Sequence, residues 1–222
     1  MKLLLTSAGI TNKFISDALL QLNGKSFEQS SMVFIPTAAN VEPGDKDWLI
    51  DDMMHCKETG INSIDIVDIS ALPRDIWEPR IRSADIIVMG GGNTYHLMYW
   101  INNSGLADIM PELLKTKVYM GISAGSMVQT TNLVLSQSAK MYTELVGEES
   151  IEKGLGNVSF HIRPHLNSPW FPKIRKDYIE KKSKMLKEPV YAIDDNTAIQ
   201  VTEGSTTFIG EGEYLVFNEN RH

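Results

Sequence analysis

The first 130 residues alternate continuous apolar runs with stretches whose apolar residues recur at helical spacing. The apolar runs predict five strands, at residues 2–6, 31–36, 63–69, 84–90 and 117–121. The amphipathic stretches between them predict helices at residues 12–23, 45–60 and 106–116. Strands that are apolar almost throughout are typical of a parallel sheet covered on both faces. Joined by right-handed crossovers, these elements predict a doubly wound α/β fold.

The pattern changes after about residue 133, where a polar stretch with Gly, Asn and Pro leads into "RPHLNSPW" at residues 163–170. Loops of this composition often carry functional residues. A helix is predicted at residues 171–187. Short apolar runs separated by turn residues then predict small antiparallel additions at the sheet edge, at residues 190–194, 197–201, 206–210 and 214–218. The length of 222 residues suits a single α/β domain over residues 1–222.

Composition narrows the choice of partners and compartment. A net charge of -7 argues against nucleic acid as a partner, because phosphate binding calls for clustered Lys and Arg. The lone Cys56 has no disulfide partner, so we expect it in the core of a cytoplasmic protein. The apolar run in "MKLLLTSAGI" is too short for a signal peptide or a membrane span, so no membrane contact is expected. Without His-x-x-x-His or paired Cys and His spacing, we expect neither a metal nor a cofactor.

The stretch "GISAGSMVQ" at residues 121–129 places Ser123 in the pattern Gly-x-Ser-x-Gly, directly after a predicted strand. Small residues around Ser123 suit a tight strand-to-helix turn that holds a nucleophile clear of the sheet. The first N–H groups of the following helix lack intrahelical partners and favour a negative charge there. Ser123 is therefore a candidate nucleophile, and a small-residue turn without chemistry is the alternative.

A second Gly-rich turn, "VMGGGNTYHL" at residues 88–97, also joins a predicted strand to a helix. Three glycines let the backbone approach a ligand closely, and a free N–H there can form half of an oxyanion hole. The stretch has neither the spacing of a dinucleotide-binding motif nor the Lys of a P-loop. Ligands of doubly wound sheets bind at the carboxyl ends of the strands, where both turns lie.

A nucleophilic serine needs a base, and the chain has five histidines. His55 and His96 lie in helical patterns, and His222 is the terminal residue, which favours packing or surface roles for all three. His161 lies in a strand-like run, whereas His165 follows a proline and opens a polar loop. We therefore prefer His165 to His161 as the base.

The third member of a triad is a carboxylate that orients the imidazole. Asp194 and Asp195 end a predicted strand in "AIDDNTAI", and Glu144 lies in the polar region that follows the serine. Each is also an ordinary turn residue, so the choice stays open on these grounds.

Four motifs in order, "GGGNTYHL", "GISAGS", "RPHLN" and "AIDDNTAI", resemble the dipeptidase E family of serine peptidases, whose relatives include the cyanophycinases. The resemblance covers nearly the whole chain, from "KLLLTS" and "VFIPTAA" onward. It implies a flavodoxin-like doubly wound fold similar to class I glutamine amidotransferases, and release of N-terminal aspartate from dipeptides. Matched by position, it implies Ser123 as nucleophile, His165 as base, and Gly92 and Ala124 as backbone oxyanion donors.

The acid does not match cleanly. Asp195 falls where some members of the family carry a Glu, whereas the aspartate that others carry after the serine falls among "SQSAK", which has no acid. Glu144 is the nearest substitute. We rank Asp195 above Glu144, because the resemblance supplies a matching position for Asp195.

Specificity for an N-terminal Asp requires a cation in the pocket, because an unpaired buried carboxylate is strongly unfavourable. Arg175 in "KIRKDYI" roughly matches the substrate-binding arginine of the family, and Arg163 is the alternative. Gly91 and Asn93, which flank Gly92, are expected to contact the substrate as well.

The sequence thus predicts a serine hydrolase of the dipeptidase E type that acts on a small peptide. One alternative is a cyanophycinase-like hydrolase that cleaves aspartyl-arginine side-chain linkages. Another is a catalytically weak binding protein that retains the pocket. A glutamine amidotransferase is disfavoured, because that class uses Cys at the turn where this chain has Ser123.

Overall fold

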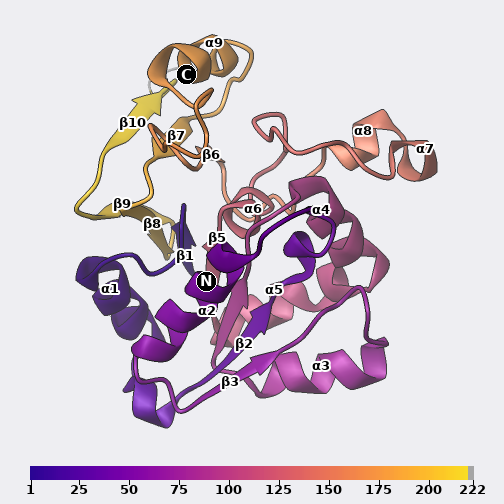
Figure 1. The fold of residues 1–222 in the computed structure, drawn as a ribbon, viewed down its shortest axis with the longest axis vertical. Coiled ribbons are helices and arrows are strands. Elements are labelled where there is room, and N and C mark those ends of the chain that lie inside the picture. The colour runs from indigo at the N-terminus through magenta and orange to yellow at the C-terminus, as the bar shows by residue number, and fades with distance from the viewer. Residues whose placement is uncertain (220–222) are drawn as a thin grey trace.

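The computed structural model describes residues 1–219, so His222 lies outside the described part (Figure 1). Its strands are β1 Lys2–Thr6, β2 Ser31–Ile35, β3 Ser63–Ile66, β4 Ile86–Met89, β5 Val118–Ile122, β6 His161–Arg163, β7 Val190–Ile193, β8 Thr197–Thr202, β9 Ser205–Gly210 and β10 Tyr214–Phe217. Its α-helices are α1 Lys13–Asn23, α2 Asp47–Glu58, α3 Arg74–Ser83, α4 Thr94–Asn103, α5 Leu106–Thr116, α6 Ala124–Met127, α7 Thr143–Val146, α8 Glu148–Ile151 and α9 Lys176–Ser183.

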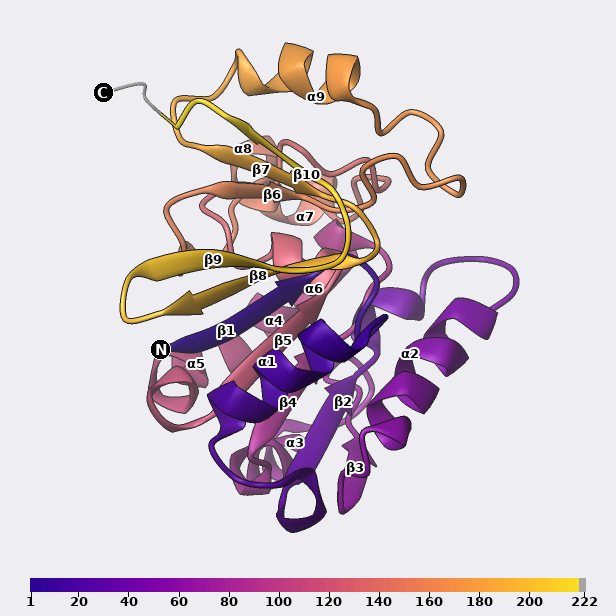
Figure 2. The ribbon, with the colours of Figure 1, turned by 90° about the vertical axis from the view of Figure 1, so that its left-hand side faces the viewer.

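The central sheet has seven strands in the order β3-β2-β4-β5-β1-β8-β9. The five strands predicted from the first part of the chain all pair in parallel, whereas β8 and β9 extend the sheet in antiparallel fashion. Helices cover both faces (Figures 1 and 2). Alternate residues of β1 pack into different cores, with Leu3 and Leu5 on one face and Leu4 on the other. The doubly wound α/β fold is confirmed.

The C-terminal additions differ in part from the prediction. Only β8 and β9 lie at the edge of the central sheet, whereas β6, β7 and β10 form a separate three-stranded sheet. In this small sheet β7 pairs in parallel with β6 and antiparallel with β10. Figure 2 shows the small sheet and α9 stacked beside the edge of the central sheet. The turn between β7 and β8 carries the chain from one sheet to the other, which no strand pattern reveals.

Two helices also depart from the prediction. The C-terminal helix begins at Lys176 rather than residue 171, because residues 168–175 form a loop fastened by the side chain of Arg175. Helix α3 was not expected, since it is highly charged and contains Pro79, yet it buries Trp77 and Ile81. Among residues 1–219 no helix combines the length and apolar character that a membrane crossing requires.

The strand order brings three chain segments together. Strands β4, β5 and β1 are neighbours and run in the same direction, so their carboxyl ends lie at the same edge of the sheet. The segments that follow these strands begin at Ser7, at Gly90 and at Ser123. The two Gly-rich turns therefore lie side by side, as the sequence predicts.

Candidate active site

Ser123 lies on a sharp turn between β5 and α6, with backbone angles of φ 48° and ψ −104°. A conformation of this kind at a residue other than glycine costs roughly 1–3 kcal/mol. Close packing requires the glycines of the motif: a Cβ on Gly121 would lie 2.6 Å from Ser126 N, and one on Gly125 would lie 2.0 Å from Met89 O. The glycines thus let the turn press against the sheet while the serine stands clear of it.

A chain of hydrogen bonds connects Ser123, His165 and Asp195. The Oγ atom of Ser123 lies 2.9 Å from Nε2 of His165, and Nδ1 of His165 lies 2.7 Å from Oδ1 of Asp195. His165 follows β6 and Asp195 follows β7, so the small sheet supplies both partners of the serine. The His165 side chain is 12% exposed, which leaves one edge of the ring open to a substrate.

The charge on Asp195 determines which nitrogen of His165 carries a proton in the Ser123–His165–Asp195 hydrogen-bond chain. Burial raises the pKa of Asp195, but its hydrogen bond with His165, the His165 charge and a hydrogen bond from Ser7 outweigh burial and lower the pKa to about 2. Asp195 is therefore ionised at neutral pH and can only accept hydrogen bonds. Nδ1 of His165 then carries the proton, and the Nε2 lone pair accepts the hydroxyl proton of Ser123. In this tautomer Nε2 faces the Ser123 hydroxyl at 2.9 Å, which is the geometry that a general base requires.

Glu144, the second candidate for the acid, lies elsewhere. It is exposed on the short helix α7 and forms no hydrogen bond to His165 among residues 1–219. The ring nitrogen that faces away from Ser123 is instead occupied by Asp195. The structure therefore removes Glu144 from the set of candidates.

Two backbone N–H groups in the turns around the serine have no hydrogen-bond acceptor within residues 1–219. Within the described residues, the N–H groups of Gly92 and Ala124 donate to no acceptor. Gly92 has φ 128°, and a Cβ there would lie 2.2 Å from Ala38 O, so only glycine fits. A Cβ on the adjacent Gly91 would lie 3.4 Å from Cβ of Ser123. The two Gly-rich turns thus each carry a free N–H group, the kind of donor that an oxyanion hole uses.

Comparison with known proteins agrees with this geometry. The sequence profile described as peptidase family S51 matches residues 3–209, almost the whole chain. The chain belongs to peptidase family S51. An uncharacterized peptidase of Pasteurella multocida is 26% identical over 205 residues, which cover 90% of this chain and 94% of the relative. A Peptidase E of Nostoc is 27% identical over 62% of this chain and 57% of its own length.

A solved structure supports the fold independently. A crystal structure assigned to a Peptidase E protein of Listeria monocytogenes superimposes with a TM-score of 0.76 at 22% identity, over 95% of this chain and 98% of that one. At this identity the match shows the fold alone. Membership in S51 and the Peptidase E relatives identify the protein as a serine peptidase. They confirm the resemblance of its motifs to the dipeptidase E family.

Not every residue of the Gly-rich turn faces a ligand in this S51 member. The side chain of Asn93 accepts hydrogen bonds from Tyr95 N and His96 N, at 3.1 and 3.0 Å, and donates to Ala139 O. It is 3% exposed. Asn93 therefore caps α4 and holds the turn, and the expectation that its side chain contacts substrate is wrong.

The two arginines have different surroundings. Arg163 is 4% exposed on β6, where Nη1 donates to Leu135 O, and burial lowers its pKa to about 10. Arg175 is half-buried, and its Nη1 donates to the carbonyls of Ser168, Phe171 and Ile174. Its Nε and Nη2 form no hydrogen bond within residues 1–219. Arg175 thus fastens the loop beside His165 and keeps donors free for a ligand.

Two site residues were missed by the sequence analysis. The hydroxyl of Ser7 donates to Asp195 at 2.7 Å and accepts the N–H of His165 at 2.8 Å, so it holds acid and base together. The ring of Phe171 stacks on His165 with centroids 4.1 Å apart. A signal for Ser7 was present, because it follows a predicted strand whose carboxyl end lies at the site edge.

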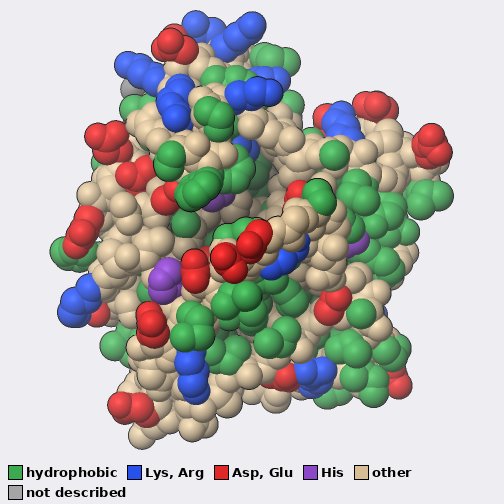
Figure 3. All heavy atoms as spheres, viewed as in Figure 1, with side chains coloured by type: hydrophobic (Ala, Val, Ile, Leu, Met, Phe, Trp, Pro, Cys, Tyr) green, Lys and Arg blue, Asp and Glu red, His purple; other side chains and the backbone are tan. Residues whose placement is uncertain are grey.

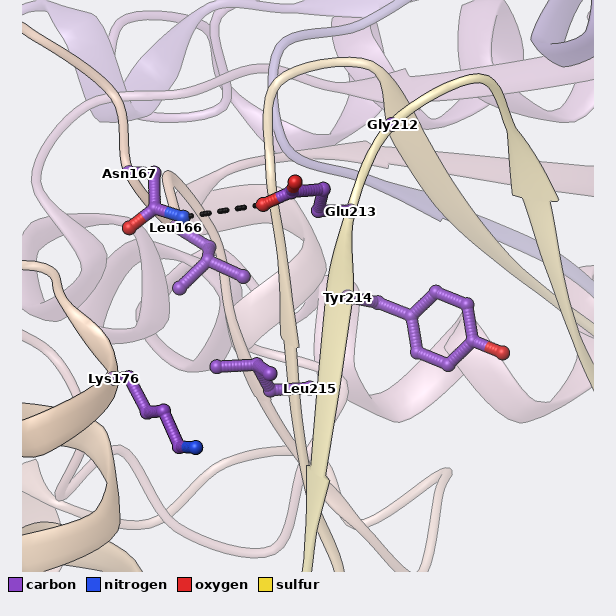
Figure 4. A pocket seen from close by; sticks show the side chains of 7 residues that line it. All are labelled: Leu166, Asn167, Lys176, Gly212, Glu213, Tyr214 and Leu215. Carbon is purple, nitrogen blue, oxygen red and sulfur yellow. Dashed lines mark hydrogen bonds between the residues drawn. The ribbon is translucent and has the colours of Figure 1, made fainter.

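A cavity of about 420 Å³ lies next to the site rather than at the serine. Figure 4 shows it between the segment that follows His165 and the start of β10, where Asn167 donates to Glu213. The face in Figure 3 has a central hollow with apolar side chains above it and a group of acidic side chains below. Within residues 1–219 no group of three or more His, Cys, Asp or Glu is arranged to hold a metal.

Proposed function

We propose that the protein is a serine peptidase of the dipeptidase E type, which hydrolyses the peptide bond after an N-terminal Asp or a similar small acidic residue. The observation that supports this proposal most directly is the Ser123–His165–Asp195 hydrogen-bond chain within a member of family S51. A binding protein that merely retained the pocket would have no need for the strained backbone at Ser123.

The reaction follows from the contacts. Nε2 of His165 takes the hydroxyl proton as Oγ of Ser123 attacks the carbonyl carbon of the scissile bond. The N–H groups of Gly92 and Ala124 stabilise the negative oxygen that forms. The C–N bond then breaks, and the protonated His165 passes its proton to the leaving amine. Water, deprotonated by His165, hydrolyses the ester and restores Ser123.

Asp195 and Ser7 prepare His165 for this task. The carboxylate fixes the ring with its proton on Nδ1 and stabilises the positive charge that develops on the imidazole. Arg175 is the proposed partner of the substrate's acidic side chain, because Nε and Nη2 remain free while Nη1 holds the loop in place. A guanidinium with two adjacent free donors suits bidentate binding of a carboxylate.

A dipeptide panel tests this function. The wild-type protein is expected to hydrolyse Asp-Leu faster than Ala-Leu and Leu-Leu, and Ser123→Ala is expected to remove the activity. Arg175→Lys should reduce the preference for Asp-Leu over Ala-Leu, since Lys cannot reproduce a bidentate contact. Equal rates on all three dipeptides would remove the proposed specificity, and unchanged hydrolysis by Ser123→Ala would remove the proposed nucleophile.

A further inference from the structure

Asp52 is a buried carboxylate that the reaction described above does not use. It lies on α2, is 8% exposed, and forms no hydrogen bond within the described residues. Burial, with a smaller contribution from the charge of Asp51, raises its pKa to about 7. A buried charge without a partner destabilises the folded protein. A cationic ligand that paired with this carboxylate would remove that destabilisation, which would contribute favourably to its binding free energy.

The carboxylate lies beside two segments of the active site. A Cβ on Gly9 would lie 3.1 Å from Oδ1 of Asp52 and 3.3 Å from Cδ1 of Ile122. Gly9 is two residues from Ser7, which binds both His165 and Asp195, and Ile122 immediately precedes Ser123. Asp52 therefore lies beside the residue that precedes Ser123 and beside the segment that carries Ser7.

The same face of α2 also reaches the Gly-rich turn. Trp48 precedes Asp52 by four residues, so the two side chains lie on one side of the helix. A Cβ on Gly91 would lie 3.7 Å from Cζ3 of Trp48 and 3.4 Å from Cβ of Ser123. Trp48 is 38% exposed, whereas Asp52 is 8% exposed. This face of α2 thus forms a wall of the site, with Trp48 at the mouth and Asp52 deeper inside.

We propose that Asp52 binds the α-ammonium group of the substrate's N-terminal residue. This inference rests on the proposed function. The α-carbon alone separates that ammonium from the carbonyl that Ser123 attacks, so the group that binds it must lie close to Ser123. A carboxylate in a partly dry site forms a strong charge-assisted hydrogen bond with an ammonium. The contact restricts hydrolysis to the first peptide bond of a chain.

The surroundings of α2 favour a cation over an anion. Asp45, Asp47 and Asp51 are exposed around the start of the helix, and repulsion by Asp45 raises the pKa of Asp47. The intervening Lys46 donates to the backbone carbonyls of Glu42 and Gly44 rather than to these carboxylates. Acidic side chains gather below the central hollow in Figure 3, in the region of α2. Their negative field attracts an ammonium and repels the acidic side chain of a substrate. That side chain is then expected to bind Arg175, in the loop beside His165.

The test compares Asp52→Asn with Asp51→Asn, which removes the same charge from the adjacent exposed position. Values of kcat/KM are measured for Asp-Leu, N-acetyl-Asp-Leu and N-acetyl-Arg-Leu. Asp52→Asn is expected to lower kcat/KM for Asp-Leu about 10- to 100-fold, the usual effect of a lost hydrogen bond to a charged group. It should leave the slow hydrolysis of both acetylated peptides unchanged. Asp51→Asn should behave as the wild type on all three peptides.

Three results for Asp52→Asn would overturn the assignment. The first two are an equal loss of kcat/KM on Asp-Leu and N-acetyl-Asp-Leu, and no loss on either peptide. The third is a loss of kcat/KM on N-acetyl-Arg-Leu, which would mean that Asp52 binds a basic side chain. Calorimetric binding to Ser123→Ala separates this inference from the proposed function. If the wild type hydrolyses no peptide, the proposed function fails. Binding of Asp-Leu by Ser123→Ala, weakened by adding Asp52→Asn and not by adding Asp51→Asn, still supports the ammonium contact. Unweakened or undetectable binding rejects it.

Discussion

Replacing Asp52 with Asn should stabilise the protein at neutral and alkaline pH while impairing its function. The carboxyl has an ordinary pKa of 3.8, which burial and Asp51 raise to about 7 in the folded protein. Between these values the folded state holds a proton that the unfolded state has released. Wild-type stability therefore decreases as the pH rises from about 4 through 7. Asn resembles the protonated carboxyl, so Asp52→Asn removes this dependence.

The magnitude follows from the same pKa change. Each pH unit between the two pKa values is equivalent to about 1.36 kcal/mol. The full rise in the pKa of Asp52 then corresponds to a loss of roughly 4 kcal/mol in the free energy of unfolding at pH 8. Water penetration and relaxation around the carboxyl make the actual loss smaller. We compare the free energy of unfolding of Asp52→Asn with that of the wild type. We expect the difference to be about 2–4 kcal/mol more in favour of Asp52→Asn at pH 8 than at pH 4.

The assay is urea denaturation of wild type, Asp52→Asn and Asp51→Asn at several values between pH 4 and pH 8. The difference between wild type and Asp52→Asn should grow steadily with pH, whereas Asp51→Asn should keep most of the wild-type pH dependence, because Asp51 makes the smaller contribution to the raised pKa of Asp52. The nearest titratable neighbour in the core, Cys56, stays neutral throughout, because burial raises its pKa to about 12. A constant difference across this range would refute the claim that Asp52 is an unpaired buried carboxyl.

Three further substitutions test the geometry of the site. Asp195→Asn should lower kcat on the order of 10⁴-fold with the fold intact, because the imidazole loses the carboxylate that fixes its tautomer; a small effect in a kinetic assay would contradict this. Phe171→Leu should lower kcat/KM with the fold intact, because the ring that stacks on His165 holds the imidazole in place; an unchanged kcat/KM would exclude this role. Gly125→Ala should lower the melting temperature sharply, because its methyl would lie 2.0 Å from Met89 O, and a wild-type melting curve would show that the turn is not tightly packed.

The sequence predicted those parts of the protein that depend on local patterns. The apolar runs identified all five parallel strands. Four of them are almost wholly buried and read as continuous apolar segments, whereas β3 is an exposed edge strand in which apolar and polar residues alternate. The Gly-x-Ser-x-Gly pattern located the sharp turn, because small residues are needed wherever a backbone packs closely against its neighbours. Strand order then placed both Gly-rich turns at one edge of the sheet.

Which carboxylate contacts His165 depends on pairing between distant segments, which no local pattern contains. Both Asp195 and Glu144 were plausible in sequence, and the choice between them follows from the pairing of β6 with β7, which sets His165 beside the end of β7. The family resemblance ranked Asp195 first, and spacing alone gave no preference. Ser7 was missed for the same reason, since its partners lie more than 150 residues away in the chain.

Side-chain direction was the other limit of the sequence analysis. Asn93 was expected to contact substrate, but an Asn directly before a helix is a favoured N-cap, and it serves as one here. Asp52 stands among other acidic residues of a predicted helix, and only the packing of α2 against Gly9 and Ile122 shows that it is buried. Such burial is a tertiary property, so an amphipathic pattern does not reveal it.

Covalent labelling tests whether Ser123 is a nucleophile activated by His165. The wild-type protein is treated with a fluorophosphonate, digested, and mapped by mass spectrometry, with Ser123→Ala and His165→Ala treated in parallel. We predict a single adduct on Ser123 in the wild type, none in Ser123→Ala, and strongly slowed labelling in His165→Ala. An unlabelled wild type, or an adduct that persists in Ser123→Ala, would show that Ser123 is not the activated nucleophile.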